Sequence, residues 1–444
     1  MLGKFNFVQR AISQVKPNQK KLPNDSQTNQ QAQNSQNNQQ REEAEKAEKA
    51  SDKNNRESYD KINPYLIDKK FNRQIAIIYV IAENNQYRVQ GFHDNTQILN
   101  TPLSNPPFLS FSQQMEGDDI STKLRQISGK MIRFSTEDKV GQKIRGEIIK
   151  LKNKLESENQ NLSFLVIHDN SDFEIPWEML NLSEDDAPDD FLGESIITVR
   201  WQDMDSVKLC EQHNNLIGLG FDTGQCSGTI VGYTNTKDFK NVEQEINTIN
   251  KFDAILFENI SDFLDHLENV QSEISLMFIA SHGFFGTDIS EMYLGEDDQK
   301  QRVYYNEFYD YDFDFLKTYR SIVFMNACHS GRLRRDKTLN IKYRIGFPTF
   351  FLKRGARGVI GTLGKVIDKY AAIVTNNFFD EYQKNKQLPV AAILRNIRAE
   401  AARNFRANKT PENRLLFIFT FMYVYYGNPM TTLQLTQNGE QPHV

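Results

Sequence analysis

A cysteine and a histidine each end a short apolar run in the second half of the sequence. Cys328 follows residues 321–327, and His282 follows residues 273–281. Runs of this kind are typical of parallel strands buried on both faces, and open α/β sheets place reactive side chains at the carboxyl ends of such strands. A thiol beside an imidazole can attack a carbonyl carbon and then protonate the leaving group. We therefore predict that Cys328 is a nucleophile and that His282 is its proton donor.

The residues next to this pair suit the same chemistry. Gly283 permits close approach of the backbone, and its N–H together with that of Cys328 is the predicted oxyanion hole. The alternative is that Cys328 is a buried, unreactive thiol, which is the usual fate of cysteine. Cys210 and Cys226 have no histidine in an equivalent position. His329 directly follows Cys328, so we expect its ring to point away from the site and to be structural.

Helices and strands alternate along the part of the sequence that positions these residues. In the first half we expect strands at residues 74–82, 86–93, 162–168 and 195–201, and helical periodicity over residues 120–158. In the second half we expect, besides the two strands already described, strands at residues 215–222, 253–257, 359–362 and 416–426 and helices at residues 240–250, 261–270, 368–384 and 388–406. This alternation predicts an α/β fold with a parallel sheet flanked by helices.

Composition divides the chain into four predicted segments. Residues 16–59 are dominated by Gln, Asn, Ser, Lys and Glu, with too few large apolar residues to offset the entropy of ordering. We therefore predict a disordered tail over residues 1–60, an N-terminal α/β portion over residues 61–206, a catalytic portion over residues 207–436, and a short tail over residues 437–444.

The overall composition excludes several classes of protein. A formal net charge of -5 over 444 residues gives no sign of a nucleic-acid-binding surface. Three cysteines cannot form a disulfide framework, and together with the lack of a signal peptide they favour a cytoplasmic protein. The most apolar segment, residues 415–426, is too short to span a bilayer, and we interpret it as a buried strand.

Two segments suggest ligand binding, but other interpretations fit them better. The glycines of residues 218–224 match neither the dinucleotide fingerprint nor the phosphate-binding P-loop, and no lysine follows them. Asp310, Asp312 and Asp314 alternate with aromatic residues, which fits an exposed face more often than a calcium site. We therefore predict no metal and no cofactor.

The motifs in the second half resemble a CHAT domain, a branch of the caspase-like cysteine peptidases that includes separase. The similarity rests on His282-Gly283, residues 326–331 around Cys328, residues 355–362 and residues 426–429. The first half is similar too, through Pro176-Trp177-Glu178, so the resemblance spans about residues 74–435. One position departs from the family, because Leu363-Gly364-Lys365 stands where a tryptophan usually follows the Gly-Thr pair.

This resemblance implies a caspase-like fold and a cysteine endopeptidase that cleaves a protein substrate. It also implies control by an activating or regulatory protein partner, and a role in cell death or defence. A catalytically silent CHAT scaffold that binds a partner through the cleft is the alternative. Nothing in the sequence names the substrate or the pathway.

The slot for the residue before the cleaved bond, the S1 pocket, is expected beside the nucleophile strand and the end of the first strand. Asn326 and Asp222 are therefore the predicted substrate-binding residues. Related enzymes that cut after Arg or Lys place an acid at the position matching Asn326, so here Asp222 would have to supply any charge; otherwise it only caps a turn. We expect a basic or polar residue before the cut, and not aspartate.

Overall fold

Strands from both halves of the sequence share one sheet. The computed structural model describes residues 73–83, 85–94, 96–106, 120–158, 163–183, 190–202, 223–270, 272–286, 288–335 and 344–437. All of these belong to one compact unit, Pro64–Val444. The predicted tail at residues 1–60 lies outside the described residues, as does all but the first residue of the short tail predicted at 437–444.

The N-terminal half contributes five strands to this sheet. A hairpin of β1 (Ile75–Glu83) and β2 (Gln86–His93) forms as predicted, and β3 (Thr96–Asn100) pairs with β2. Strand β4 (Phe164–Asp169) runs parallel to β1, and β5 (Ile197–Trp201) runs parallel to β4. Strand β5 is buried at every position, as expected for a parallel strand covered on both faces.

The helical stretch expected at residues 120–158 is two helices, α2 (Ile120–Thr136) and α3 (Lys139–Ser157). The break occurs because the Asp138 carboxylate accepts hydrogen bonds from the N–H groups of Val140 and Gly141, which starts a new helix. A Cβ on Gly141 would lie 1.9 Å from the carbonyl oxygen of Phe134, so only glycine fits this junction.

The Pro-Trp-Glu segment of the N-terminal half forms a buried polar cluster. It folds as the short helix η3 (Trp177–Met179), followed by α4 (Leu192–Ser195). The Glu178 carboxylate pairs with the guanidinium of Arg200 on β5, with 3.0 Å between Nε and Oε1. Burial opposes ionisation, but the charge and hydrogen bonds of Arg200 lower the pKa of Glu178 overall. The pair is therefore ionised in the core and ties this segment to the sheet.

The second half builds the parallel part of the sheet. Its strands run in the order β7, β6, β8, β11, β14. The elements up to β8 are β6 (Gln225–Thr234), α5 (Val242–Ile249), β7 (Ala254–Phe257), α6 (Ile260–Asn269) and β8 (Ile274–Phe284). After β8 come η4 (Ile289–Glu291), β9 (Tyr293–Gly295), η5 (Gln299–Gln301), β10 (Arg302–Tyr304), η6 (Glu307–Asp310), α7 (Asp314–Tyr319), β11 (Ile322–Ala327), β12 (Arg334–Arg335), β13 (Arg344–Ile345), α8 (Phe347–Lys353) and β14 (Gly358–Thr362).

Strand β6 corrects one prediction. The sequence suggested that a strand at residues 215–222 ends at Asp222 and that the glycine-rich residues 223–232 follow it as a connection. Instead, the strand of the sheet lies at Gln225–Thr234, within the glycine-rich stretch. Gly232 fits there because its neighbours are the side chain of Leu256 and the backbone of Phe278, which leave little room for a side chain. Residues 215–222 themselves lie outside the described part of the chain.

The C-terminal segment corrects a second prediction. Residues 416–426 were interpreted as one strand, but helix α11 (Pro411–Met422) occupies most of them, and β15 (Tyr423–Gly427) is short. Thr410 caps α11 by accepting a hydrogen bond from the N–H of Asn413, and Pro411 suits the first helical position. An apolar run of this length does not by itself distinguish a buried helix from a buried strand.

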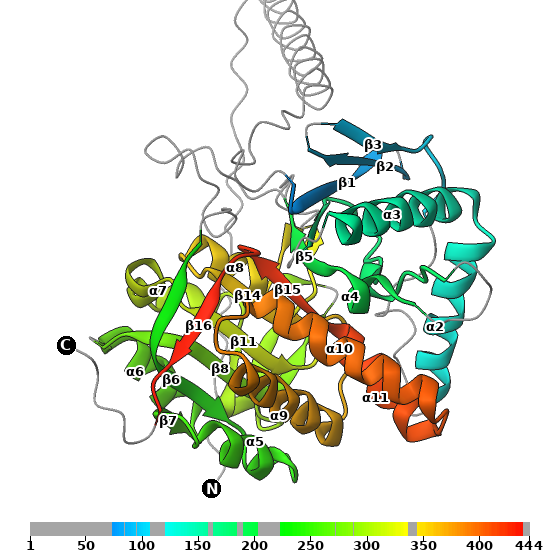
Figure 1. Ribbon diagram of the computed structural model, residues 1–444. Helices are drawn as coiled ribbons and strands as arrows, with labels where there is room; N and C mark the ends of the chain where they lie inside the picture. The colour runs from blue at the N-terminus through cyan, green and yellow to red at the C-terminus, as the bar shows by residue number, and fades with distance from the viewer. Residues whose placement is uncertain are drawn as a thin grey trace, which may run out of the picture. The chain divides into compact units, whose positions relative to one another are not determined.

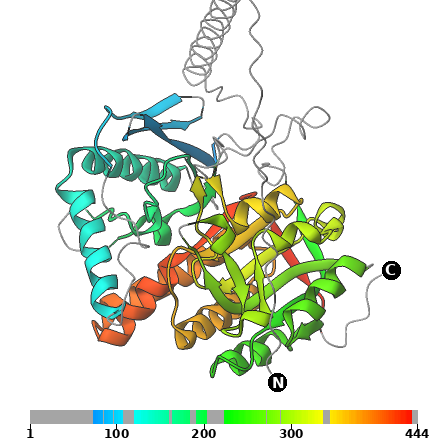
Figure 2. The ribbon, with the colours of Figure 1, turned by 180° about the vertical axis from the view of Figure 1, so that it is seen from behind.

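Strand β15 joins the two halves. It pairs antiparallel with β14 on one side and parallel with β5 on the other. Helices α9 (Asp368–Lys384) and α10 (Val390–Ala407) lie over the face of the sheet turned to the viewer in Figure 1, and β16 (Thr432–Leu435) pairs with β6. Figure 2 shows the unit from the opposite side, with the blue and cyan N-terminal elements beside the green-to-orange C-terminal ones. The predicted fold class, α/β with a largely parallel sheet flanked by helices, is confirmed.

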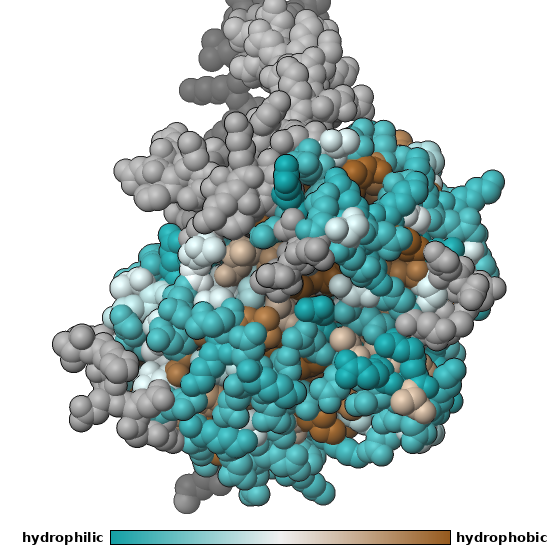
Figure 3. Space-filling view, in the orientation of Figure 1, coloured by the Kyte–Doolittle hydropathy of each residue, from teal (hydrophilic) through white to brown (hydrophobic). Residues whose placement is uncertain are grey.

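The surface turned to the viewer in Figure 3 is mostly hydrophilic, with small separate hydrophobic patches. Within the described residues, no helix combines the length and the apolar character needed to cross a lipid bilayer.

Candidate active site

The two predicted reactive residues lie at the same edge of the sheet: Cys328 directly follows β11, and His282 lies near the carboxyl end of β8, whose last three residues pair with β9. Strands β8 and β11 are parallel neighbours, and Ala327 pairs with Ser281, so Cys328 and His282 are the next residues in register. The backbones are in close contact here, because a Cβ on Gly283 would lie 2.1 Å from the carbonyl oxygen of Cys328. Glycine is therefore required at position 283 for β8 to pass this close to the backbone of Cys328.

Cys328 is half-buried, and its sulfur lies against the segment that follows β14. Its Sγ lies 3.3 Å from the N–H donor nitrogen of Val366 and 3.5 Å from the Val366 carbonyl oxygen, to which the thiol donates. Burial raises the pKa of the Cys328 thiol, although the Val366 N–H, the charge of Lys365 and the N–H of Cys328 itself act in the opposite direction. At neutral pH the sulfur is therefore a protonated thiol.

A hydrogen-bonded turn after Cys328 explains the His-Ser-Gly sequence. The Ser330 hydroxyl donates to the Ala327 carbonyl at 2.8 Å and accepts from the N–H of Thr362 at 3.1 Å. His329 adopts a φ of 60°, in the left-handed region. Burial and the charge of Arg332 lower the pKa of the His329 ring to about 4, so this ring is uncharged at neutral pH.

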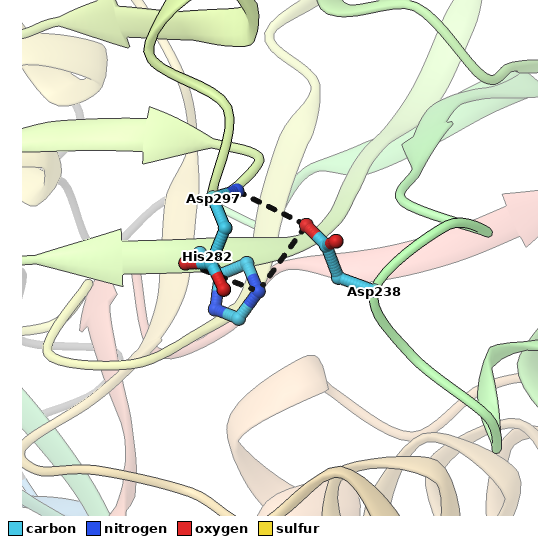
Figure 4. Close-up of side chains that lie close together, drawn as sticks. All are labelled: Asp238, His282 and Asp297. Atoms are coloured by element: carbon cyan, nitrogen blue, oxygen red, sulfur yellow. Dashed lines mark hydrogen bonds and ion pairs between the residues drawn. The ribbon is translucent and has the colours of Figure 1, made fainter.

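The imidazole of His282 faces two carboxylates, as Figure 4 shows. Its Nε2 lies 3.4 Å from Oδ2 of Asp238 and 3.8 Å from Oδ1 of Asp297, and its ring packs on Phe239 with 4.5 Å between centroids. One ligand atom from each of Asp238, His282 and Asp297 lies within 4.8 Å of the others, so the three could coordinate a divalent cation. Such a cation would occupy the imidazole nitrogen and compete with proton transfer through that ring.

Asn326, predicted to bind substrate, lies below Cys328 in a buried polar network. Its amide nitrogen donates to the Glu245 carboxyl at 2.7 Å and to the Thr375 hydroxyl at 2.9 Å, and its amide oxygen accepts from the Tyr423 hydroxyl. Burial raises the pKa of Glu245 to about 8, although the hydrogen bonds from Asn326 and Thr375 act to lower it. Asp222, the other predicted substrate-binding residue, lies outside the described residues.

The reasoning that assigned Asp222 does not hold. It assumed that Asp222 ends the first strand, whereas that strand, β6, begins at Gln225 and ends at Thr234. The residues that follow the carboxyl end of β6 are Asn235 to Asp238. Sequence analysis therefore missed Asp238, and it also missed Asp297, Glu245 and Val366. The signal for Asp238 was its place after a strand end, which a correct boundary for β6 would have revealed.

Comparison with protein families identifies the domain to which these elements belong. The family model of the CHAT domain matches residues 140–417, which include every element from α3 to most of α11. The chain belongs to the CHAT-domain family. This confirms the resemblance inferred from the motifs around His282 and Cys328.

Two solved structures illustrate the similarity of the CHAT domain to other proteins. The Saccharomyces cerevisiae separase–securin complex matches with 12% identity and a TM-score of 0.45, over 82% of this chain and 31% of the separase chain. The complex of the pro- and mature domains of Porphyromonas gingivalis RgpB matches with 10% identity and a TM-score of 0.40, over 69% and 77% of the two chains. The CHAT-domain chain thus spans less than a third of the separase chain. Comparison with curated protein sequences finds no match.

Proposed function

We propose that this CHAT-domain protein is a cysteine endopeptidase with Cys328 as nucleophile and His282 as acid–base group. The main support is the register of β8 and β11, which continues into His282 and Cys328, together with the contact between the backbones of Gly283 and Cys328. A thiol and an imidazole at one edge of a sheet are the groups that acyl transfer to sulfur requires.

In the proposed reaction, Sγ of Cys328 bonds to the peptide carbonyl carbon while its proton passes to Nδ1 of His282. The C–N bond then breaks, the same proton moves to the departing amine, and a thioester remains. Water loses a proton to the imidazole, hydrolyses the thioester and restores the thiol. The N–H groups of Gly283 and Cys328 are the proposed donors to the oxyanion.

We propose further that the enzyme rests in a state of low activity until a protein partner or another signal acts. Two features support this. The thiol proton of Cys328 is directed at the carbonyl of Val366, and burial raises the pKa of the thiol. A shift of residues 363–366 away from the sulfur would remove both restraints, because it would expose the thiol and free its proton for His282.

For the substrate, we propose a basic or polar residue before the cut bond, with Asn326 in the S1 pocket. Glu245 replaces Asp222 as the source of charge, because it contacts Asn326 directly. Within the described part of the chain, the carboxyl of Glu245 accepts hydrogen bonds from the neutral side chains of Asn326 and Thr375. A cation entering beside Asn326 would favour the ionised form of Glu245 and bind it. A peptide library varied at this position tests the proposal: E245Q should weaken any preference for Lys and Arg, whereas a strong preference for Asp would exclude it.

A catalytically silent scaffold is the alternative, and the protonated, shielded thiol of Cys328 is the observation that favours it. A comparison of new protein N-termini in the native cell, between wild type and C328A, separates the two. The peptidase proposal expects N-termini that are absent in C328A and also in H282A. It fails if purified, folded C328A or H282A retains the wild-type rate of cleavage, or if wild type generates no new N-termini under any activating condition.

A further inference from the structure

Two turns from different parts of the chain converge on the outer nitrogen of His282. One turn follows β6 and provides Asp238, and the other follows β9 and provides Asp297 (Figure 4). Neither turn is near His282 in the sequence. Their meeting point is the side of the imidazole on which Nε2 lies, which leaves Nδ1 as the other nitrogen of the ring.

Hydrogen bonds hold the Asp238 carboxylate in this position. Its Oδ2 accepts from Nδ2 of the buried Asn235 at 2.7 Å and from the backbone N–H of Asp297 at 3.0 Å. Oδ1 of Asn235 in turn accepts the N–H groups of Lys237 and Asp238 at 3.2 and 3.1 Å, which fixes the turn. The carboxylate oxygen nearest the imidazole is therefore fixed by groups that the ring itself does not provide.

The second turn is fixed separately. The guanidinium of Arg302 donates to the carbonyl of Glu296 at 3.0 Å and also to that of Asp297. The Glu296 carboxylate pairs with Lys237 at 3.1 Å, so the two turns are also linked to each other. The site of His282 is thus preorganised by both turns.

The charges around His282 favour a proton on Nε2. Burial acts to raise the pKa of Asp238, but the hydrogen bonds from Asn235 and Asp297 and the charges of His282 and Lys237 lower it overall. Asp238 is therefore an anion at neutral pH. An anion at 3.4 Å favours the tautomer with a hydrogen on Nε2.

We propose that Asp238 is a positioning residue that holds His282 with its hydrogen on Nε2 and its Nδ1 free to take the proton of Cys328. This inference rests on the proposed peptidase function, because it assigns Asp238 a role in that reaction. Asp297 contributes less than Asp238 to holding the ring of His282. Its side chain is 74% exposed, whereas that of Asp238 is 25% exposed and accepts two hydrogen bonds. Solvent weakens the interaction of the more exposed carboxylate with the ring.

A divalent cation held by the same three residues is the competing explanation. Its ligand atoms would lie within 4.8 Å of one another. However, one of the three ligands would be Asp297, whose side chain is 74% exposed and therefore largely solvated. Nε2 of His282 lies 3.4 Å from Oδ2 of Asp238 without forming a hydrogen bond, so the role that the geometry supports for Asp238 is an electrostatic one.

The test compares D238N, D297N and D238E in the full-length chain. D297N is the matched control, because it removes the same charge next to the same nitrogen. The first readout needs no substrate: ¹⁵N spectra of the histidines, with His282 assigned by its loss in H282Q. Wild type and D297N should show the Nε2–H tautomer, and D238N should lose it. Retention of that tautomer in D238N would overturn the inference.

The second readout is kcat/KM against pH on a peptide that wild type cleaves. D238N should lower kcat about tenfold or more with little change in KM at every pH, because the ring is no longer held in the productive tautomer. D297N should change kcat less than about threefold, and D238E should recover part of the loss. Equal losses in D238N and D297N would contradict the assignment.

Zinc chloride and EDTA distinguish the metal explanation. Inhibition of wild type but not of D238N by zinc chloride, together with activation of wild type by EDTA, would overturn the positioning role in favour of a metal site. If no variant cleaves any peptide but only D238N loses the tautomer, the peptidase proposal fails while the orientation of His282 by Asp238 stands.

Discussion

The buried carboxyl of Glu245 should make the free energy of unfolding depend on pH. The substitution Glu245→Gln should remove this dependence. Burial raises the pKa of this carboxyl from 4.5 to about 8, so the native protein keeps a proton that the unfolded chain releases above pH 4.5. Each pH unit between the two values costs the native state about 1.4 kcal/mol. Glu245 therefore lowers the free energy of unfolding by about 5 kcal/mol between pH 4.5 and pH 8, with no penalty below that range.

The substitution Glu245→Gln keeps the size of the side chain and an oxygen that accepts the hydrogen bonds of Asn326 and Thr375, but it cannot ionise. We expect E245Q and wild type to have similar Tm values at pH 5, and E245Q to become increasingly more stable as the pH approaches 8. E243Q is the control, since Glu243 is an exposed residue of the same helix.

Thermal unfolding followed by circular dichroism from pH 5 to pH 8.5 measures this difference. If the Tm curves of E245Q and wild type stay parallel over the whole range, Glu245 is ionised in the native protein and the reasoning from burial is refuted. A Tm for E243Q that follows the E245Q curve would instead show a general effect of net charge.

Three further predictions concern the strand ends and the buried ion pair. Gly283→Ala should abolish cleavage and cost about 1–3 kcal/mol of stability, because the new Cβ would lie 2.1 Å from a carbonyl oxygen; Gly146→Ala, with no atom within 4 Å, should be harmless in the same assays. The rate of Cys328 alkylation by iodoacetamide, followed by mass spectrometry, should still be rising above pH 9, since burial raises the pKa of the thiol, and a plateau near neutral pH would contradict this. Glu178→Gln should cost about 3–5 kcal/mol in urea unfolding, whereas the double variant with Arg200→Met should cost clearly less; equal costs would show that the pair is not coupled.

The strands that carry His282 and Cys328 were predicted from the sequence, because short buried apolar runs leave a clear signal. The apolar runs before His282 and Cys328 are buried strands, as their composition indicated. The parallel register of β8 and β11 then brings the two residues to the same edge of the sheet. Gly283 was predicted for close approach of the backbone, and its contact with Cys328 is of that kind. These features are local, so the pattern of a few residues is enough to reveal them.

Other features depend on contacts that no local pattern reveals. The break at Asp138 and the helix α11 follow from caps at Asp138 and Thr410, which the continuous apolar periodicity concealed. The convergence of Asp238 and Asp297 on His282 depends on where two turns lie in the folded chain. Aspartate is common in exposed loops, so the sequence gave no reason to choose Asp297, and Asp238 could be chosen only with the correct boundary of β6.

Strand β15 stands between β14 and β5 in the sheet, although it follows both in the sequence. During synthesis the ribosome therefore releases two separate blocks of strands before the segment that joins them exists. Unpaired strand edges invite pairing with other chains, so we expect the nascent protein to need a chaperone in that interval. The same late segment brings Tyr423, whose hydroxyl bonds to Asn326 below the nucleophile. The buried network below Cys328 is thus completed only after β15 has left the ribosome.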